Sequence, residues 1–175
     1  IVDDIAKQGN IYLNNLQVKS ILDRQKDAFR RLRFDESTNR NLRSLLIDPS
    51  QLEVDLPGKI EFWDQDLDPS QKETITHTLA AKDIFLVQGP PGTGKTRTIV
   101  ELTRQLLNDE RHKTSKVLIA SQSNVAVNHA LSSLIKAEPG LQDRIARVGR
   151  EEKAENTSDL LIDQQIMRWS QQVSK

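Results

Sequence analysis

The chain has 175 residues, with 25 basic and 25 acidic side chains and no cysteine. This length suits one domain with appendages and excludes a large two-lobed enzyme; the lack of cysteine excludes a disulfide framework and a thiolate zinc site. Hydrophobic residues make up 36% of the chain, below the roughly 45–50% apolar content of a typical globular domain. We interpret this shortfall as exposed helices or missing neighbours and not as disorder.

The sequence shows no membrane or secretion signal. Its longest apolar runs, at 84–87 and 117–120, are far shorter than the roughly 20 residues of a membrane span, and the N-terminus has no signal-peptide pattern. We therefore expect a soluble, cytoplasmic chain with no membrane partner. Because it begins on Ile1 and stops within a polar helical pattern, we also expect a piece of a longer protein.

The net charge of zero hides an uneven distribution along the chain. Residues 59–110 carry six basic and nine acidic side chains, a net charge of −3, whereas residues 111–150 carry seven and two, a net charge of +5. A basic stretch favours contact with nucleic-acid phosphates, and chance variation in a short window is the alternative.

The N-terminal part is predicted to be helical. Residues 11–33 fit a long amphipathic helix whose charged face we interpret as solvated, with phosphate contact as the alternative. Pro49, Pro57 and Gly58 then break regular structure. The apolar stripe of this helix consists of Val18, Ile21, Leu22, Ala28, Phe29 and Leu32.

A second helix has a sharp predicted start. Asp68 suits the N-cap, Pro69 suits the first helical position, and Ser70 with Glu73 has the spacing of a capping box. Gln71 lies just inside this helix, where its amide could both donate to and accept from an adenine edge. An ordinary exposed glutamine is the alternative.

From residue 84 the pattern alternates between strands and helices. Strands are predicted at 84–88, 116–120 and 144–148, and helices at 96–107 and 124–136. This order predicts an α/β fold, in which helices cover a parallel sheet. The helix at 96–107 is expected to bury Ile99, Val100, Leu102, Leu106 and Leu107, and a C-terminal helix carries Ile162, Ile166, Trp169 and Val173 on one face.

A complete phosphate-loop motif, G-x-x-x-x-G-K-[ST], lies between the first predicted strand and its helix, which is the context the motif requires. Glycines let backbone N–H groups point at phosphates, and the helix start adds a positive dipole end. Lys95 would neutralise the phosphates and the Thr96 hydroxyl would bind Mg²⁺. The motif consists of Gly89, Pro90, Pro91, Gly92, Thr93, Gly94, Lys95 and Thr96.

Two polar clusters follow at the ends of the second and third predicted strands. The first, at 121–128, places Ser121, Ser123 and Asn124 at a helix N-terminus, where they can contact phosphates or simply cap the helix. The second, at 147–150, contains Arg147 and Arg150, at the strand end where open α/β sheets place ligands. Two solvated arginines are the alternative there.

In order and spacing, these motifs resemble the superfamily 1B helicases of the nonsense-mediated-decay helicase type, also called Dna2/Nam7-like helicases. Residues 67–71 look like the family's adenine-reading Q motif, 89–96 like motif I, 121–128 like motif Ia and 147–149 like motif Ib. The resemblance covers nearly the whole chain, although specific motifs occur only between residues 67 and 150. It implies a helical stalk and linker over 1–58, a RecA-like P-loop domain over 59–150 and the start of a helical insertion over 151–175.

The resemblance also implies roles for single residues. ATP and Mg²⁺ would be the cofactors: Gln71 would read adenine, Lys95 and Thr96 would act at the phosphates, and Arg97 would join the nucleotide-binding set. Single-stranded RNA or DNA would be the partner, since backbone contacts do not inspect the base and no 2′-OH reader is identifiable. The expected strand-binding residues are Ser121, Ser123, Asn124, Val127 and Arg147. Asn128 departs from the family, which often has aspartate there.

The acidic motif and the arginines that ATP hydrolysis needs are not evident. The nearest imitation, Leu160 to Asp163, fits a helix better than a strand. We therefore expect a fragment that binds nucleotide without turning it over, with the acidic motif and a second RecA-like domain elsewhere in the helicase. An AAA+ type ATPase and a nucleotide-dependent switch or scaffold are the alternatives.

Overall fold

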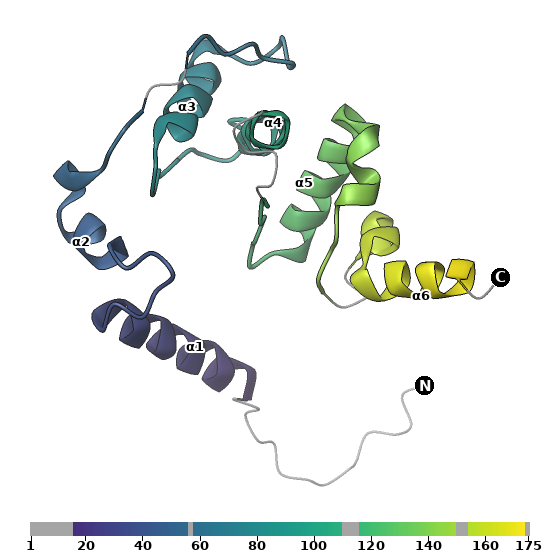
Figure 1. The fold of residues 1–175 in the computed structure, drawn as a ribbon, viewed down its shortest axis with the longest axis horizontal. Coiled ribbons are helices and arrows are strands. Elements are labelled where there is room, and N and C mark those ends of the chain that lie inside the picture. The colour runs from purple at the N-terminus through teal and green to yellow at the C-terminus, as the bar shows by residue number, and fades with distance from the viewer. Residues whose placement is uncertain (1–15, 56–57, 110–115, 150–153, 174–175) are drawn as a thin grey trace, which may run out of the picture. The chain divides into compact units, whose positions relative to one another are not determined.

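A computed structural model of the chain describes residues 16–55, 58–109, 116–149 and 154–173 (Figure 1). The chain divides into two compact units, with the boundary between Leu52 and Glu53. The predicted boundaries after residues 58 and 150 stay predictions. No helix within the described ranges is long and apolar enough to cross a bilayer.

The first unit is helical. It contains α1 (Leu16–Arg33), α2 (Leu42–Ile47) and the short 3-10 helix η1 (Pro49–Gln51). α1 occupies most of the helix predicted over 11–33, and residues 11–15 lie outside the described residues. Asp27 supports α1 through ion pairs with Arg30 and Arg31, one turn away. The predicted apolar stripe is largely exposed, at Val18, Ile21, Leu22 and Phe29.

The second unit packs its helices around a small core. α4 (Lys95–Asn108) contacts both α3 (Pro69–Ala80) and α5 (Asn124–Ala137), and Figure 1 shows it nearly end-on between them. After α5 come the 3-10 helices η3 (Pro139–Arg144) and η5 (Glu155–Leu160), and then α6 (Ile162–Val173). The buried apolar side chains of this unit are Leu67, Ile75, Ala80, Ala130, Leu131, Leu134, Leu141, Ala154, Leu160 and Leu161.

The predicted strands at 84–88, 116–120 and 144–148 are not strands in the structure. Among the described residues, β-type backbone pairing is limited to two isolated bridges, antiparallel at Val54–Ala81 and parallel at Arg147–Leu161. The most exposed apolar side chains of the predicted strands are those of Leu86, Leu118 and Val148, at 83%, 89% and 85%. An apolar run marks residues suited to a buried parallel strand, but such a strand also needs neighbouring strands and covering helices. The described residues therefore do not form the predicted parallel sheet.

The start of α3 confirms part of the prediction and corrects the rest. Asp68 is the N-cap and Pro69 the first helical residue, as predicted. The capping box, however, joins Asp68 to Gln71, not Ser70 to Glu73. A capping box links the N-cap to the third helical residue, and Ser70 already lies inside the helix.

The face of α4 that is fully buried also differs from the prediction. Thr98, Glu101 and Thr103 are buried, whereas Ile99 is 40% exposed. The two threonine hydroxyls donate to carbonyls one turn back, and the carboxylate of Glu101 accepts tertiary hydrogen bonds. Polar groups whose hydrogen bonds are satisfied can be buried in this way. In α6 the apolar side chains of Ile162, Ile166 and Trp169 are exposed, and that of Val173 lies outside the described residues.

Candidate functional site

The predicted phosphate loop leads directly into α4. Gly92 and Gly94 have φ angles of +82° and +75°, in the left-handed region that favours glycine. Gly94 is also the N-cap of α4, and a Cβ added to it would overlap Nε2 of Gln71. Both glycines are therefore required by the conformation of the loop.

The two halves of the loop differ in hydrogen-bonding character. Pro90 and Pro91 have no N–H group, so the first half presents carbonyls, and Nζ of Lys95 donates to those of Gly89 and Pro90 at 2.7 and 2.6 Å. In the second half, the first helical bond of α4 runs from Thr98 N to Gly94 O, and no side chain caps the helix. The N–H groups of the first turn are thus oriented for an anion.

Gln71 connects α3 to this loop. Its Nε2 donates to the carbonyl of Thr93 at 3.2 Å, and its Oε1 accepts from Asp68 N at 3.1 Å. The hydroxyl of Thr93 in turn donates to Pro90 O at 2.9 Å. The amide predicted to read adenine therefore lies at the phosphate loop, although its contact with a base stays a prediction.

Arg97, which directly follows the loop, forms ion pairs with two acidic residues. Its guanidinium forms two hydrogen bonds to Asp64 and one of 3.0 Å to Asp66. These hydrogen bonds hold the pKa of the Asp64 carboxyl below its usual value and raise the pKa of Arg97. Arg97 thus anchors the segment before α3 to the start of α4.

The sequence interpretation missed the acid that holds this segment. Glu101 of α4 is 1% exposed, and its carboxylate accepts from the backbone N–H groups of Trp63 and Asp64 at 3.0 and 3.2 Å. Gln105 donates to the same carboxylate at 2.9 Å. The signal in the sequence is a single glutamate between apolar residues, Val100 and Leu102, at the centre of a predicted helix.

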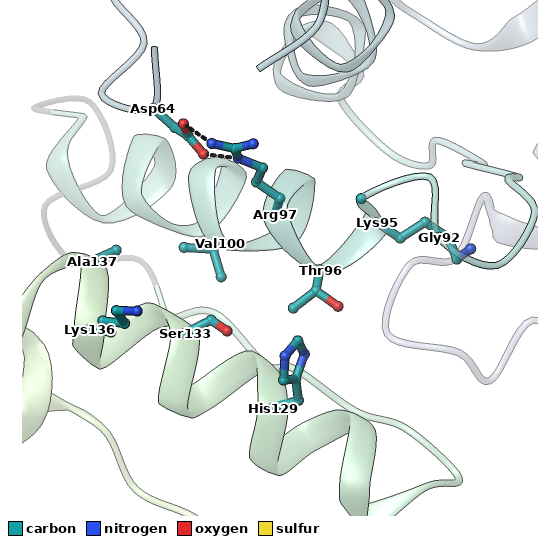
Figure 2. A pocket seen from close by; sticks show the side chains of 11 residues that line it. Asp64, Gly92, Lys95, Thr96, Arg97, Val100, His129, Ser133, Lys136 and Ala137 are labelled. Atoms are coloured by element: carbon teal, nitrogen blue, oxygen red, sulfur yellow. Dashed lines mark hydrogen bonds and ion pairs between the residues drawn. The ribbon is translucent and has the colours of Figure 1, made fainter. Parts of the chain in front are cut away.

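A cavity of about 740 Å³ opens beside the loop, between α4 and α5 (Figure 2). Lys95, Thr96 and Arg97 line it from α4, so the cavity joins the predicted phosphate site. Its α5 side consists of Ala137 and of three polar residues that were not predicted to be functional, His129, Ser133 and Lys136. No group of three or more His, Cys, Asp or Glu side chains in the described part of the chain is arranged to hold a metal.

The predicted strand-binding cluster lies at the start of α5. Ser123 is the N-cap, and its Oγ accepts from Ala126 N at 3.4 Å. Ser121 and Asn124 are exposed, and Val127 is half-buried. The structure therefore leaves polar groups of Ser121, Ser123 and Asn124 at the surface of this helix end.

Arg147 lies apart from that surface. It is 3% exposed, and its Nε donates to Oδ1 of Asn128 at 3.1 Å. The Thr157 hydroxyl donates to the same oxygen at 3.2 Å. The structure thus gives Arg147 a buried position that links α5 to η5, and Arg150 lies outside the described residues.

The chain is similar in sequence to known proteins. The AAA domain family matches residues 66–175, which is more than half of the chain. An ATP-dependent helicase of Methanocaldococcus jannaschii, described as uncharacterized, is 43% identical over 52% of this chain and 13% of its own length. The DNA polymerase alpha-associated DNA helicase A of Schizosaccharomyces pombe is 37% identical over 45% of this chain and 11% of its own length.

A third relative carries an RNA-related name. This protein of Saccharomyces cerevisiae, named as a candidate ATP-dependent RNA helicase, is 32% identical over 70% of this chain and 10% of its own length. The matched segment thus spans about a tenth of each of these relatives. No solved structure matches the chain.

Proposed function

The chain belongs to the AAA domain family of P-loop nucleoside triphosphatases, and within it to the superfamily 1B helicases, and we propose that it supplies the nucleotide-binding part of an ATP-dependent helicase. The observation that carries the proposal is the phosphate loop at the start of α4. Its two left-handed glycines, the uncapped first helical turn and Lys95 form a site suited to an oxyanion chain.

The residues at the loop fit ATP and Mg²⁺ by their chemistry. The N–H groups of α4 and the ammonium of Lys95 suit phosphate oxygens, and the Thr96 hydroxyl is the oxygen that would bind Mg²⁺. Gln71 would contact adenine while it stays part of the α3 capping box. Bound Mg²⁺ would supply charge neutralisation at the terminal phosphates.

Binding of a fluorescent ATP analogue to the 175-residue chain tests this proposal. Lys95→Ala should weaken binding by at least tenfold, because hydrogen bonds to a charged group contribute roughly 1.5–3 kcal/mol. Lys82→Ala is the matched control, since Lys82 forms an exposed ion pair with Glu53. Equal affinity of the Lys95→Ala variant and the unmodified chain would reject the site.

We further propose that the chain alone does not turn ATP over. The loop-proximal carboxylate, Asp64, is engaged by Arg97, and Asp163, from the segment that imitates an acidic motif, lies in the first turn of α6. Because Arg97 occupies the Asp64 carboxylate and Asp163 does not line the cavity, we expect neither to activate a water at the phosphates. Steady-state phosphate release by the chain that Lys95→Ala abolishes would contradict this.

A second part of the proposal concerns single-stranded nucleic acid. The exposed polar groups of Ser121, Ser123 and Asn124 at the start of α5 suit phosphate or sugar oxygens, and Val127 lies next to them on α5. Buried Arg147 would act through Asn128 by fixing α5. The names of the relatives include both DNA and RNA helicases, so the binding test uses single-stranded DNA and single-stranded RNA.

The predicted parallel sheet and stalk are also part of the proposal. The exposed Leu86, Leu118 and Val148 are side chains that a parallel sheet of the P-loop fold would bury. The exposed apolar stripe of α1 suits packing of a stalk against the rest of a helicase, including a second RecA-like domain. The helicase names of the relatives favour this assignment over an AAA+ type ATPase or a switch.

A further inference from the structure

The α5 side of the cavity carries side chains that neither motif explains. Figure 2 shows His129 projecting from α5 toward Thr96, with Ser133 one turn further along. His129, Ser133 and Lys136 are four and three positions apart, so they share one face of the helix. The opposite side of α5 is the one that buries Leu131 and Leu134.

The chemistry of this face favours an anion. The imidazole, the hydroxyl and the ammonium can all donate hydrogen bonds, and Thr96 adds a second hydroxyl from α4. Among the described residues, none pairs with the ammonium of Lys136 in an ion pair. Of the described residues, Asp64 alone brings a carboxylate to the cavity lining, and it is already hydrogen-bonded to Arg97. The lining thus offers donors and positive charge with one neutralised acid.

We propose that this cavity binds a phosphate group between Thr96 of the loop and His129, Ser133 and Lys136 of α5. The phosphate comes either from the end of a nucleoside triphosphate or from free inorganic phosphate, and both share this chemistry. The inference rests on the proposed function only in that Thr96 belongs to both sites. It makes α5, which begins with the proposed strand-binding residues, a direct contact of the phosphate.

Calorimetric titration of the 175-residue chain tests the proposal with three ligands: inorganic phosphate, ADP and a non-hydrolysable ATP analogue. His129→Ala combined with Lys136→Gln should lower the affinity for either the triphosphate analogue or inorganic phosphate by about tenfold or more. This is the loss expected for a charge-assisted hydrogen bond. ADP affinity should change less than twofold. His77→Ala combined with Lys72→Gln on α3 is the matched control, since neither residue lines the cavity.

The two ligand arms identify the source of the phosphate. A selective loss for the triphosphate analogue assigns the cavity to the terminal phosphate of the nucleotide, and a selective loss for inorganic phosphate assigns it to the free anion. Because His129 and Lys136 are exposed, the double variant should keep its circular-dichroism spectrum. The single variant Lys136→Arg, which preserves the charge, should keep most of the affinity for the phosphate ligand.

The failure of this proposal differs from the failure of the proposed function. If the double variant binds all three ligands as the unmodified chain does, the cavity site is rejected while the loop site stands. If the unmodified chain binds inorganic phosphate through His129 and Lys136 but binds no ADP, the nucleotide site is rejected and the cavity site stands. Binding of none of the three ligands overturns both.

Discussion

Gly94 meets two separate demands that only a residue without a side chain satisfies. Its φ of +75° is a left-handed conformation, which costs other residues roughly 1–2 kcal/mol, and its Cα faces the amide of Gln71. The absence of a side chain at Gly94 thus allows Gln71 of α3 to contact the loop. The same contact makes the geometry of Gln71 depend on the loop.

Gly94→Ala should therefore destabilise the chain and weaken nucleotide binding. We expect a loss of about 2 kcal/mol in the free energy of unfolding, from backbone strain plus displacement of Gln71. Urea denaturation measures the first effect and titration with an ATP analogue the second. Gly140→Ala is the control, because a Cβ there meets nothing within 4 Å; equal effects of the two substitutions would contradict the role of Gly94.

Asp64 makes stability depend on pH at the acidic end. Its folded-state pKa is lowered by the hydrogen bonds from Arg97, so its contribution is complete above the unfolded value of about 3.9 and is lost as the pH falls through the lowered folded pKa. The unfolding free energies of the chain and Asp64→Asn should differ by a constant amount above pH about 5 and converge below about 4. The effect is small, since the Arg97 side chain is 41% exposed.

Urea denaturation from pH 2 to pH 7 measures this convergence. Asp66→Asn is the control, because the Asp66 side chain is 86% exposed and leaves the Asp64 pair intact. A difference between the chain and Asp64→Asn that stays constant down to pH 2 would contradict the assignment.

For single residues, the sequence predicts the glycine turn that leads into a helix, which the structure confirms, but not the side chains that support this turn. The glycines, Lys95 and Thr96 follow from spacing within eight residues, and their conformations depend mainly on local backbone geometry. Asp64 and Glu101, by contrast, are 37 positions apart in the sequence and meet only in the folded chain. No local pattern encodes that meeting.

Among the elements, α4 is the one on which the site is assembled. Its first turn forms the proposed anion-binding end, and Glu101, two turns later, fixes the backbone of Trp63 and Asp64. Arg104 reinforces this contact, with its guanidinium 4.9 Å from the centre of the Trp63 ring and 3.0 Å from Glu138. One helix therefore holds the segment before α3 and the end of α5.

Glu101→Ala should be strongly destabilising. It leaves two backbone N–H groups without their acceptor, at a cost of about 3 kcal/mol, and chemical denaturation followed by circular dichroism measures it. Glu101→Gln keeps one acceptor oxygen and should lose about half as much. Glu73→Ala, an exposed glutamate on α3, should change stability by less than about 0.5 kcal/mol; a similar small change at Glu101 would contradict its role.

The predicted helices are confirmed while the predicted strands stay predictions, for one physical reason. The helices α3, α4 and α5 follow from caps and from a period of about 3.6, both of which act within a few residues. A parallel strand is stabilised by neighbours far away in the sequence. Leu86 and Leu118 are therefore apolar, as residues of a buried strand are, but their backbone forms no β-bridge in the described part of the chain.

For the whole molecule, charge distribution matters more than net charge. A net charge of zero gives no long-range attraction for a polyanion, so we expect the proposed binding to a single strand to come from the basic stretch at 111–150. Burial of Arg147 removes one of its cations from the surface, whereas Lys116, Lys136 and Arg144 are exposed. The chain should thus bind weakly, through a few contacts.

Salt dependence measures those contacts directly. With about three phosphates neutralised, the logarithm of the association constant for a single-stranded oligonucleotide should fall with a slope of roughly −2 against the logarithm of salt concentration, as fluorescence anisotropy would show for DNA and RNA alike. Lys116→Gln combined with Arg144→Gln removes two of the three contacts and should reduce the steepness by about two thirds. Ser123→Ala combined with Asn124→Ala should weaken binding at every salt concentration and leave the slope unchanged.

The charge-matched control lies in the first unit. Lys19→Gln combined with Arg24→Gln removes two exposed cations from α1 and should leave the slope as it is. If this variant flattens the salt dependence and the Lys116 and Arg144 variant does not, the strand binds at α1 and the basic stretch is not the interface. Because both variants remove the same net charge, the comparison separates local contact from the total charge of the molecule.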